Sequence, residues 1–327
     1  MKEIAQRIGD KFKKAGSIWL ASHVRPDGDA IGSLTALGLA LQNAGKKVTM
    51  LLSDGVPANF RYLPGSSQIV KKFEPGTALR VAVDCSDGRR LGRLFTDGDR
   101  FDVSIDHHIT NVMPAELNLV EPEEPATSAI LAKYLPLWGL EITPDVATCL
   151  LTGVISDTLG FRTSNMTPDT LRLSALLMEK GANLPDLYQR ALIRRSFDAA
   201  RYWGFGLSRL QCVDRLLWTT LTAADRKEVG YPGRDDADLM AVLSAIDGAD
   251  VAVIFNEQSD GKIKISWRSQ PGFDVSKLAV SLGGGGHPAA AGAELTGTME
   301  EVQTKVLADT RLIVQDGNGF QPEKQGK

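Results

Sequence analysis

The stretch that decides the fold is SIWLASHVRPDGDAIGSLTALGLALQNA, residues 17–44. It opens with a short apolar run at 17–22, continues through a loop that contains proline and glycine, and ends in an apolar helical stretch at 30–44. More buried strands are predicted by the apolar runs 47–52, 79–83 and 101–105. This alternation of strands with helices predicts an α/β fold whose first domain has a parallel sheet covered on both faces.

A second, smaller α/β unit is predicted in the C-terminal part. The first domain is expected to end with a helix over 168–180, which has Thr167 at its cap and Gly181 after its end. We therefore expect a first domain at 1–183, a helical connector at 184–210, a second domain at 211–316 and a flexible tail at 317–327. In the second domain we expect strands at 215–222, 250–256 and 262–268, and helices at 236–246, 274–281 and 299–313.

Composition narrows the class of protein. The chain has 327 residues, of which 43% are hydrophobic, and a formal net charge of −3. A long nucleic-acid groove usually carries a basic footprint, so this charge argues against long nucleic acid as a partner. The three cysteines form no CxxC pair, and no run is apolar and long enough for a membrane span. We expect a cytoplasmic protein with reduced thiols and no membrane partner.

Four polar clusters carry the candidate chemistry. The first, HVRPDGDAIGS at 23–33, offers His23, Asp27 and Asp29 on the loop after the first strand. Taken alone, Pro-Asp-Gly-Asp could be a solvated turn. Asp84 and the run Asp106-His107-His108 stand where later apolar strands end, and Asp157 ends an apolar helical stretch. Taken alone, Asp84 and Asp157 could each be a cap or turn residue.

The joint pattern is more specific than any single cluster. Three of the four histidines fall in these clusters, and ligands of parallel sheets bind at the carboxyl ends of strands. Imidazoles and several carboxylates without a thiolate suit two metals such as manganese better than structural zinc. Two such metals can share a water and stabilise both oxygens of a phosphoryl transfer.

The segment KISWRSQPGFDVSKLAVSLGGGGHPAAAG, residues 264–292, is the remaining candidate site. Its glycines at 283–286 would let a ligand approach the backbone N–H groups. Arg268 could hold a phosphate through two parallel hydrogen bonds. After His287, Pro288 and the small residues that follow predict the start of a helix, whose N-terminus would favour phosphate.

At this point the chain resembles the DHH phosphoesterases. The loop at 23–33, Asp84, Asp106-His107-His108 and the stretch around Asp157 resemble the ordered motifs of that family, and the segments 266–269 and 283–292 resemble its C-terminal DHH-associated (DHHA1) domain. The resemblance covers nearly the whole chain. Its length is similar to the nanoRNase/pAp phosphatase group, the NrnA-type oligoribonucleases.

The resemblance implies a role for each candidate. His23, Asp27 and Asp84 would hold one Mn²⁺, and Asp29, Asp84, His107 and Asp157 the other, with Co²⁺ or Mg²⁺ as substitutes. Asp106 would support the histidine pair, and His108 would face the substrate as phosphate ligand or proton donor. The second domain would grip the terminal nucleotide through Arg268, Gly285, Gly286 and His287.

The implied activity is a manganese-dependent hydrolysis of very short RNA, from dinucleotides to about five residues, into nucleoside monophosphates. A second expected substrate is 3′-phosphoadenosine 5′-phosphate (pAp). The sequence is compatible with a homodimer. An alternative is a cyclic-di-AMP or linear-dinucleotide phosphodiesterase in signalling, which would use the same residues. Long single-stranded DNA and pyrophosphate are disfavoured as substrates. A non-catalytic nucleotide sensor is also disfavoured, because every expected metal ligand is present.

Overall fold

The computed structural model describes residues 1–72, 76–95, 99–163 and 165–316. The chain divides into two compact units, Met1–Arg194 and Arg195–Lys327, and each is described by itself. This boundary falls inside the segment 184–210 that we expected to connect the domains. The expected tail, 317–327, lies outside the described residues.

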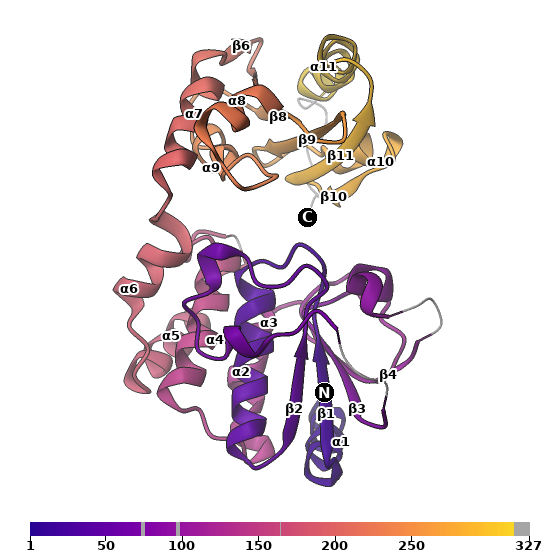
Figure 1. Ribbon diagram of the computed structural model, residues 1–327, viewed down its shortest axis with the longest axis vertical. Helices are drawn as coiled ribbons and strands as arrows, with labels where there is room; N and C mark the ends of the chain where they lie inside the picture. Colours follow the sequence, from indigo (N-terminus) through magenta and orange to yellow (C-terminus); the bar gives the residue numbers. More distant parts are fainter. Residues whose placement is uncertain (73–75, 96–98, 164, 317–327) are drawn as a thin grey trace, which may run out of the picture. The chain divides into compact units, whose positions relative to one another are not determined.

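The first unit is built on a parallel sheet of five strands in the order β2-β1-β3-β4-β5. Figure 1 shows β1, β2 and β3 pointing in the same direction. The strands are β1 (Ser17–Ala21), β2 (Lys47–Leu51), β3 (Leu79–Val83), β4 (Phe101–Asp106) and β5 (Ala115–Val120). Because every pair is parallel, all five carboxyl ends lie along one edge of the sheet. The four strands predicted from apolar runs are confirmed.

Helices lie on one face of this sheet. They are α1 (Lys2–Lys14), α2 (Gly28–Asn43), α3 (Thr127–Tyr134), α4 (Pro144–Asp157), α5 (Pro168–Glu179) and α6 (Leu184–Tyr188). Of these, α1, α2 and α3 contact the strands, α4 packs on α2 and α3, and α5 and α6 pack on α4. Ile18, Leu20 and Val81 belong to the main core with residues of these helices, such as Leu34. The alternate residues of the strands face a smaller core.

The opposite face of the sheet is covered by short turns. Trp19, Ala21 and Ala82 pack there with Leu91 and Phe95. Leu91 belongs to the 3-10 segment η3 (Gly88–Leu94). Other short segments are η1 (Ala58–Phe60), η2 (Ser66–Gln68), η4 (Pro136–Trp138) and the π-helical turn η5 (Gln189–Ile193). Both faces are covered, as the alternation predicted, although the second is covered by turns.

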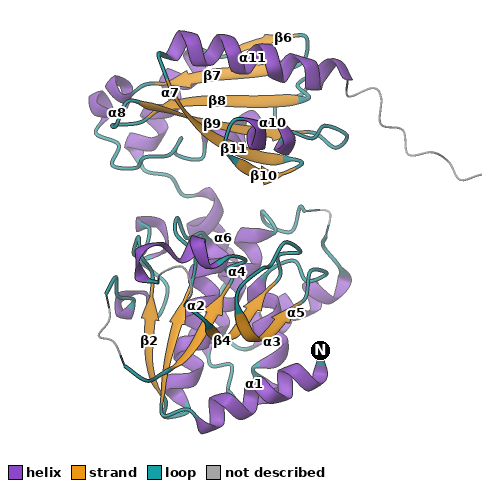
Figure 2. Ribbon diagram, turned by 90° about the vertical axis from the view of Figure 1, so that its right-hand side faces the viewer, coloured by secondary structure: helices purple, strands orange, loops and turns teal. Residues whose placement is uncertain are grey.

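The second unit holds a mixed six-stranded sheet in the order β10-β11-β9-β8-β7-β6 (Figure 2). The strands are β6 (Gln211–Val213), β7 (Leu216–Leu221), β8 (Val251–Glu257), β9 (Lys262–Ser269), β10 (Gly285–His287) and β11 (Ala290–Thr296). Its helices are α7 (Phe197–Ser208), α8 (Ala223–Val229), α9 (Leu239–Leu243), α10 (Ser276–Ser281) and α11 (Met299–Asp316). Trp267 and Phe255 centre one core, and Tyr202 and Ile254 the other.

One prediction for this unit was wrong, and one predicted helix is present but shorter. No helix begins after His287, because 285–287 and 290–296 form the antiparallel hairpin β10–β11. Gly286 has φ 146°, and an added Cβ would lie 2.4 Å from the Ala290 carbonyl oxygen, so the hairpin depends on glycine there. The helix expected at 236–246 shortens to Leu239–Leu243, because residues 237 and 238 have positive φ. Among the described residues, no helix has the length and apolar character needed to cross a membrane.

Candidate metal centre

The loop after β1 presents His23 and Asp27. The His23 ring can only donate to the Val24 carbonyl oxygen, 2.9 Å from Nδ1, so the neutral ring has its lone pair on Nε2. Asp27 caps α2 through Oδ1, which accepts hydrogen bonds from the backbone N–H groups of Asp29 and Ala30. Its other oxygen lies 3.8 Å from His23 Nε2. The cap thus aims one carboxylate oxygen at a free imidazole nitrogen.

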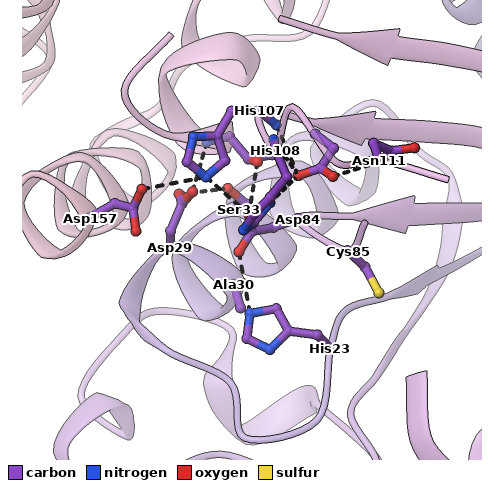
Figure 3. A network of polar contacts seen from close by, with 12 residues as sticks. His23, Asp29, Ala30, Ser33, Asp84, Cys85, His107, His108, Asn111 and Asp157 are labelled. Atoms are coloured by element: carbon purple, nitrogen blue, oxygen red, sulfur yellow. Dashed lines mark hydrogen bonds and ion pairs between the residues drawn. The ribbon is translucent and has the colours of Figure 1, made fainter. Parts of the chain in front are cut away.

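Asp84 lies at the centre of the cluster (Figure 3). It follows β3 with φ 52°, in the left-handed region, and its N–H donates to the Ile105 carbonyl oxygen. The side chain is buried, with Oδ2 3.6 Å from His23 Nε2 and Oδ1 3.9 Å from His107 Nε2. One carboxylate therefore faces histidines from two different strand ends, which is the arrangement that a bridging ligand needs.

Asp106, the last residue of β4, holds the histidine pair. It is fully buried, and Oδ1 accepts hydrogen bonds from the His107 N–H at 2.9 Å and from His108 Nδ1 at 2.7 Å. Its Oδ2 accepts from the Asn111 amide at 2.6 Å. With Nδ1 of His108 donating, Nε2 of that ring is the free nitrogen.

His107 meets the end of α4. Its Nδ1 donates to the Glu124 carbonyl oxygen at 3.3 Å, which leaves Nε2 free, 3.4 Å from Asp157 Oδ2. Asp29, His107 and Asp157 form one of three groups whose potential ligand atoms lie within 4.8 Å of one another. The other groups are His23 with Asp27 and Asp84, and Asp84 with His107 and His108. All six residues expected to bind metal thus lie together in the first unit.

The crowding of carboxylates perturbs their pKa values. Burial, followed by the negative charge of Asp84, raises the pKa of Asp29 to about 7. Burial and the charges of Asp29 and Asp84 raise the pKa of Asp157 to about 9. Burial would also raise the pKa of Asp84, but its contact with His23 holds that pKa below the usual range. The cluster can be fully ionised at neutral pH only if positive charge is added, so its donor set fits divalent cations.

Several residues of the site were not predicted. Thr127, Ser128 and Ser33 donate hydrogen bonds to Asp29 or Asp84, and no metal-binding pattern singles them out. Arg90, on η3, was also missed, although it follows the Asp84 motif closely. Its positive charge acts against protonation of His23 and His108. The contacts of Thr127 and Ser128 join residues far apart in the chain, whereas Ser33 lies about one helical turn after Asp29 and inside the motif at 23–33.

The remaining candidates lie in the second unit. Arg268 is on β9, opposite Ala290 of β11, and Gly285, Gly286 and His287 form β10. A Cβ at Gly286 would collide with the hairpin partner, whereas a Cβ at Gly285 would meet nothing within 4 Å. Gly286 therefore serves the hairpin, and Gly285 leaves open space beside the backbone.

Comparison with known proteins finds the same two-part organisation. The family described as "DHH family, N-terminal domain" matches residues 17–154, and "DHHA1 domain" matches residues 230–315. A Thermus thermophilus protein named bifunctional oligoribonuclease and PAP phosphatase NrnA is 34% identical over 300 residues, which cover 90% of each chain. A Bacillus subtilis protein of the same name is 24% identical over 92% of this chain and 95% of its own.

Solved structures share the fold. An exopolyphosphatase-related protein from Bacteroides fragilis aligns over 96% of this chain and 98% of its own, with a TM-score of 0.86 and 24% identity. At that identity the likeness concerns the arrangement of strands and helices and not the chemistry.

Proposed function

Because the chain belongs to the DHH family and carries a DHHA1 domain, we propose that it is a metal-dependent phosphoesterase that degrades very short RNA to nucleoside monophosphates and also dephosphorylates pAp. The observation that carries the proposal is the position of Asp84, whose two oxygens face His23 on one side and His107 on the other. The names of the relatives from T. thermophilus and B. subtilis support the choice of substrate.

Two of the three groups of side chains support the proposed ligand sets, with Asp84 added to the group of Asp29, His107 and Asp157. His23, Asp27 and Asp84 would hold one cation, and Asp29, Asp84, His107 and Asp157 the other. Bound there, two cations would lower the pKa of a shared water and stabilise charge on the phosphate oxygens. Imidazole nitrogen mixed with carboxylate oxygen, without a thiolate, favours Mn²⁺, with Co²⁺ and Mg²⁺ as substitutes.

His108 is the proposed acid of the reaction. Its Nδ1 donates to Asp106, and this contact raises the pKa of His108 although burial opposes the rise. A protonated His108 presents an Nε2–H group that can bind the phosphate or give its proton to the leaving oxygen. Asp106 positions the ring, and Asn111 holds Asp106 in turn.

In the second unit, we propose that Arg268, Gly285, Gly286 and His287 bind the terminal nucleotide. The guanidinium offers paired donors for phosphate, and Gly285 leaves its backbone open to a ligand. The net charge of −3 argues against a long strand as the substrate, since proteins that bind long nucleic acid usually carry a net basic surface.

The test is a turnover panel in Mn²⁺ with a 5′-phosphorylated RNA dinucleotide, a long RNA, pAp and cyclic di-AMP. We expect rapid hydrolysis of the dinucleotide, measurable release of phosphate from pAp, and little cleavage of the long RNA. Asp84→Asn, purified in the same way, controls for contaminating nucleases. Preference for cyclic di-AMP would instead support the signalling alternative, and nucleotide binding without hydrolysis of any substrate would refute the enzyme.

A further inference from the structure

The first turn of α3 contacts carboxylates from two different parts of the metal centre. The backbone N–H groups of Thr127 and Ser128 donate to Asp29, at 2.7 Å to Oδ2 and 3.0 Å to Oδ1. The Ser128 hydroxyl also donates to Asp29 Oδ1. The Thr127 hydroxyl turns the other way and donates to Asp84 Oδ1 at 2.9 Å. Thr127 and Ser128 are completely buried, so no water competes for these contacts.

These bonds limit how Asp29 can bind a cation. An ionised carboxylate offers about two acceptor positions on each oxygen. The N–H and hydroxyl of Ser128 occupy both positions on Oδ1. The Ser33 hydroxyl also donates to that oxygen, at 3.1 Å. Among the described residues, Oδ2 accepts only the Thr127 N–H, so one position stays free. Asp29 can therefore offer a cation a single oxygen, Oδ2.

The helix that ends in Asp157 is packed against the same contacts. A Cβ added at Gly153, on α4, would lie 1.8 Å from the Ser128 Oγ and 2.6 Å from Asp29 Oδ1. Contacts that short do not occur, so the absence of a side chain lets α4 touch this cluster directly. The turn of α3 thus lies between elements that supply three of the metal-binding carboxylates.

We propose that Thr127 and Ser128 are positioning residues that set the cation affinity of the site. Ser128 fixes Asp29 as a ligand through one oxygen, and Thr127 fixes Asp84, which both cations share. This inference rests on the metal-dependent function proposed above. Neither residue touches the reacting atoms, so their loss should weaken metal binding more than turnover at saturating metal.

The test measures Mn²⁺ binding to the full-length protein by calorimetry, without substrate. Thr127→Val and Ser128→Ala each remove one hydroxyl, and we expect at least about tenfold weaker Mn²⁺ binding in each. Thr127→Ser keeps the hydroxyl and should bind as the wild type does. Thr35→Val and Ser174→Ala are matched controls, because those buried hydroxyls donate to carbonyl oxygens of their own helices.

Two further measurements separate positioning from folding. Thermal melting of the metal-free variants shows whether they are folded. If Ser128→Ala does not fold, Thr127→Val, which keeps the side-chain volume, carries the test. At saturating Mn²⁺, turnover of the RNA dinucleotide should return to within about threefold of wild type.

Wild-type affinity in both variants, or an equal loss in the control variants, would overturn the inference. Weaker Mn²⁺ binding in a protein that hydrolyses none of the nucleotides would leave the inference standing and refute the proposed function. A wild-type protein that binds no Mn²⁺ would refute both.

Discussion

Binding of divalent metal should release protons at neutral pH, and the number follows from the crowded carboxylates. The pKa of Asp157 is raised to about 9 and that of Asp29 to about 7 in the metal-free protein. At pH 7 the first group is almost fully protonated and the second about half, which gives about 1.5 bound protons. A cation binds only the ionised carboxylates, so these protons must leave when the site fills.

The number of protons released on metal binding should change with pH in one direction. From the same two pKa values, the carboxylates would release about 1.9 protons at pH 6 and about 1.0 at pH 8. The pKa of His23 is also raised, despite the opposing effect of burial, by its contact with Asp84. His23 would therefore add to the release most strongly at the lower pH. The total should fall as pH rises.

Calorimetric titration with Mn²⁺ measures this number directly. The heat of binding at one pH, compared between buffers of different ionisation enthalpy, gives the protons released per protein. Asp157→Asn keeps the shape of the side chain and removes the group of highest pKa, so at saturating Mn²⁺ it should release about one proton fewer at pH 7. A wild-type protein that released no protons at pH 7, or an Asp157→Asn variant that released as many as the wild type at pH 6, would refute the crowding argument.

Three further predictions follow. The pKa values of Asp29 and Asp157 are raised above the ordinary value of 3.8, so the metal-free protein should become less stable as the pH rises from about 4 to 9. Melting temperatures measured in EDTA should decrease over this range, and Mn²⁺ should make the decrease smaller. Asp84→Asn should lower turnover at least about 100-fold while the fold persists by circular dichroism, since one side chain would serve both cations. Gly286→Ala should lower the unfolding temperature and raise KM, whereas Gly285→Ala, with open space around its Cβ, should leave the unfolding temperature unchanged.

Most strands and helices of the first unit could be predicted from sequence, because they are marked by local residue patterns. The apolar runs that became β1 and β3 are mostly buried, as strands in the middle of a parallel sheet usually are. β5, AELNLV, lies at an edge of the sheet and was not among the predicted strands. The hairpin β10–β11 was taken for a helix, because small residues after a proline are compatible with both, and only pairing with β9 decides between them.

The candidate metal ligands were identifiable from sequence for the same reason. Each follows a strand or ends a helix within a short motif, and the carboxyl ends of parallel strands lie along one edge of the sheet. Sequence alone therefore determined the α/β class, the order of the motifs and which side chains could bind cations. Only the tertiary structure decided how those side chains are held. Asp29 and Ser128 are 99 residues apart, and their contact exists because α2, α3 and α4 pack together around buried hydroxyls and a glycine. No local spacing encodes that packing, since it depends on the close approach of three helices that are distant in the chain.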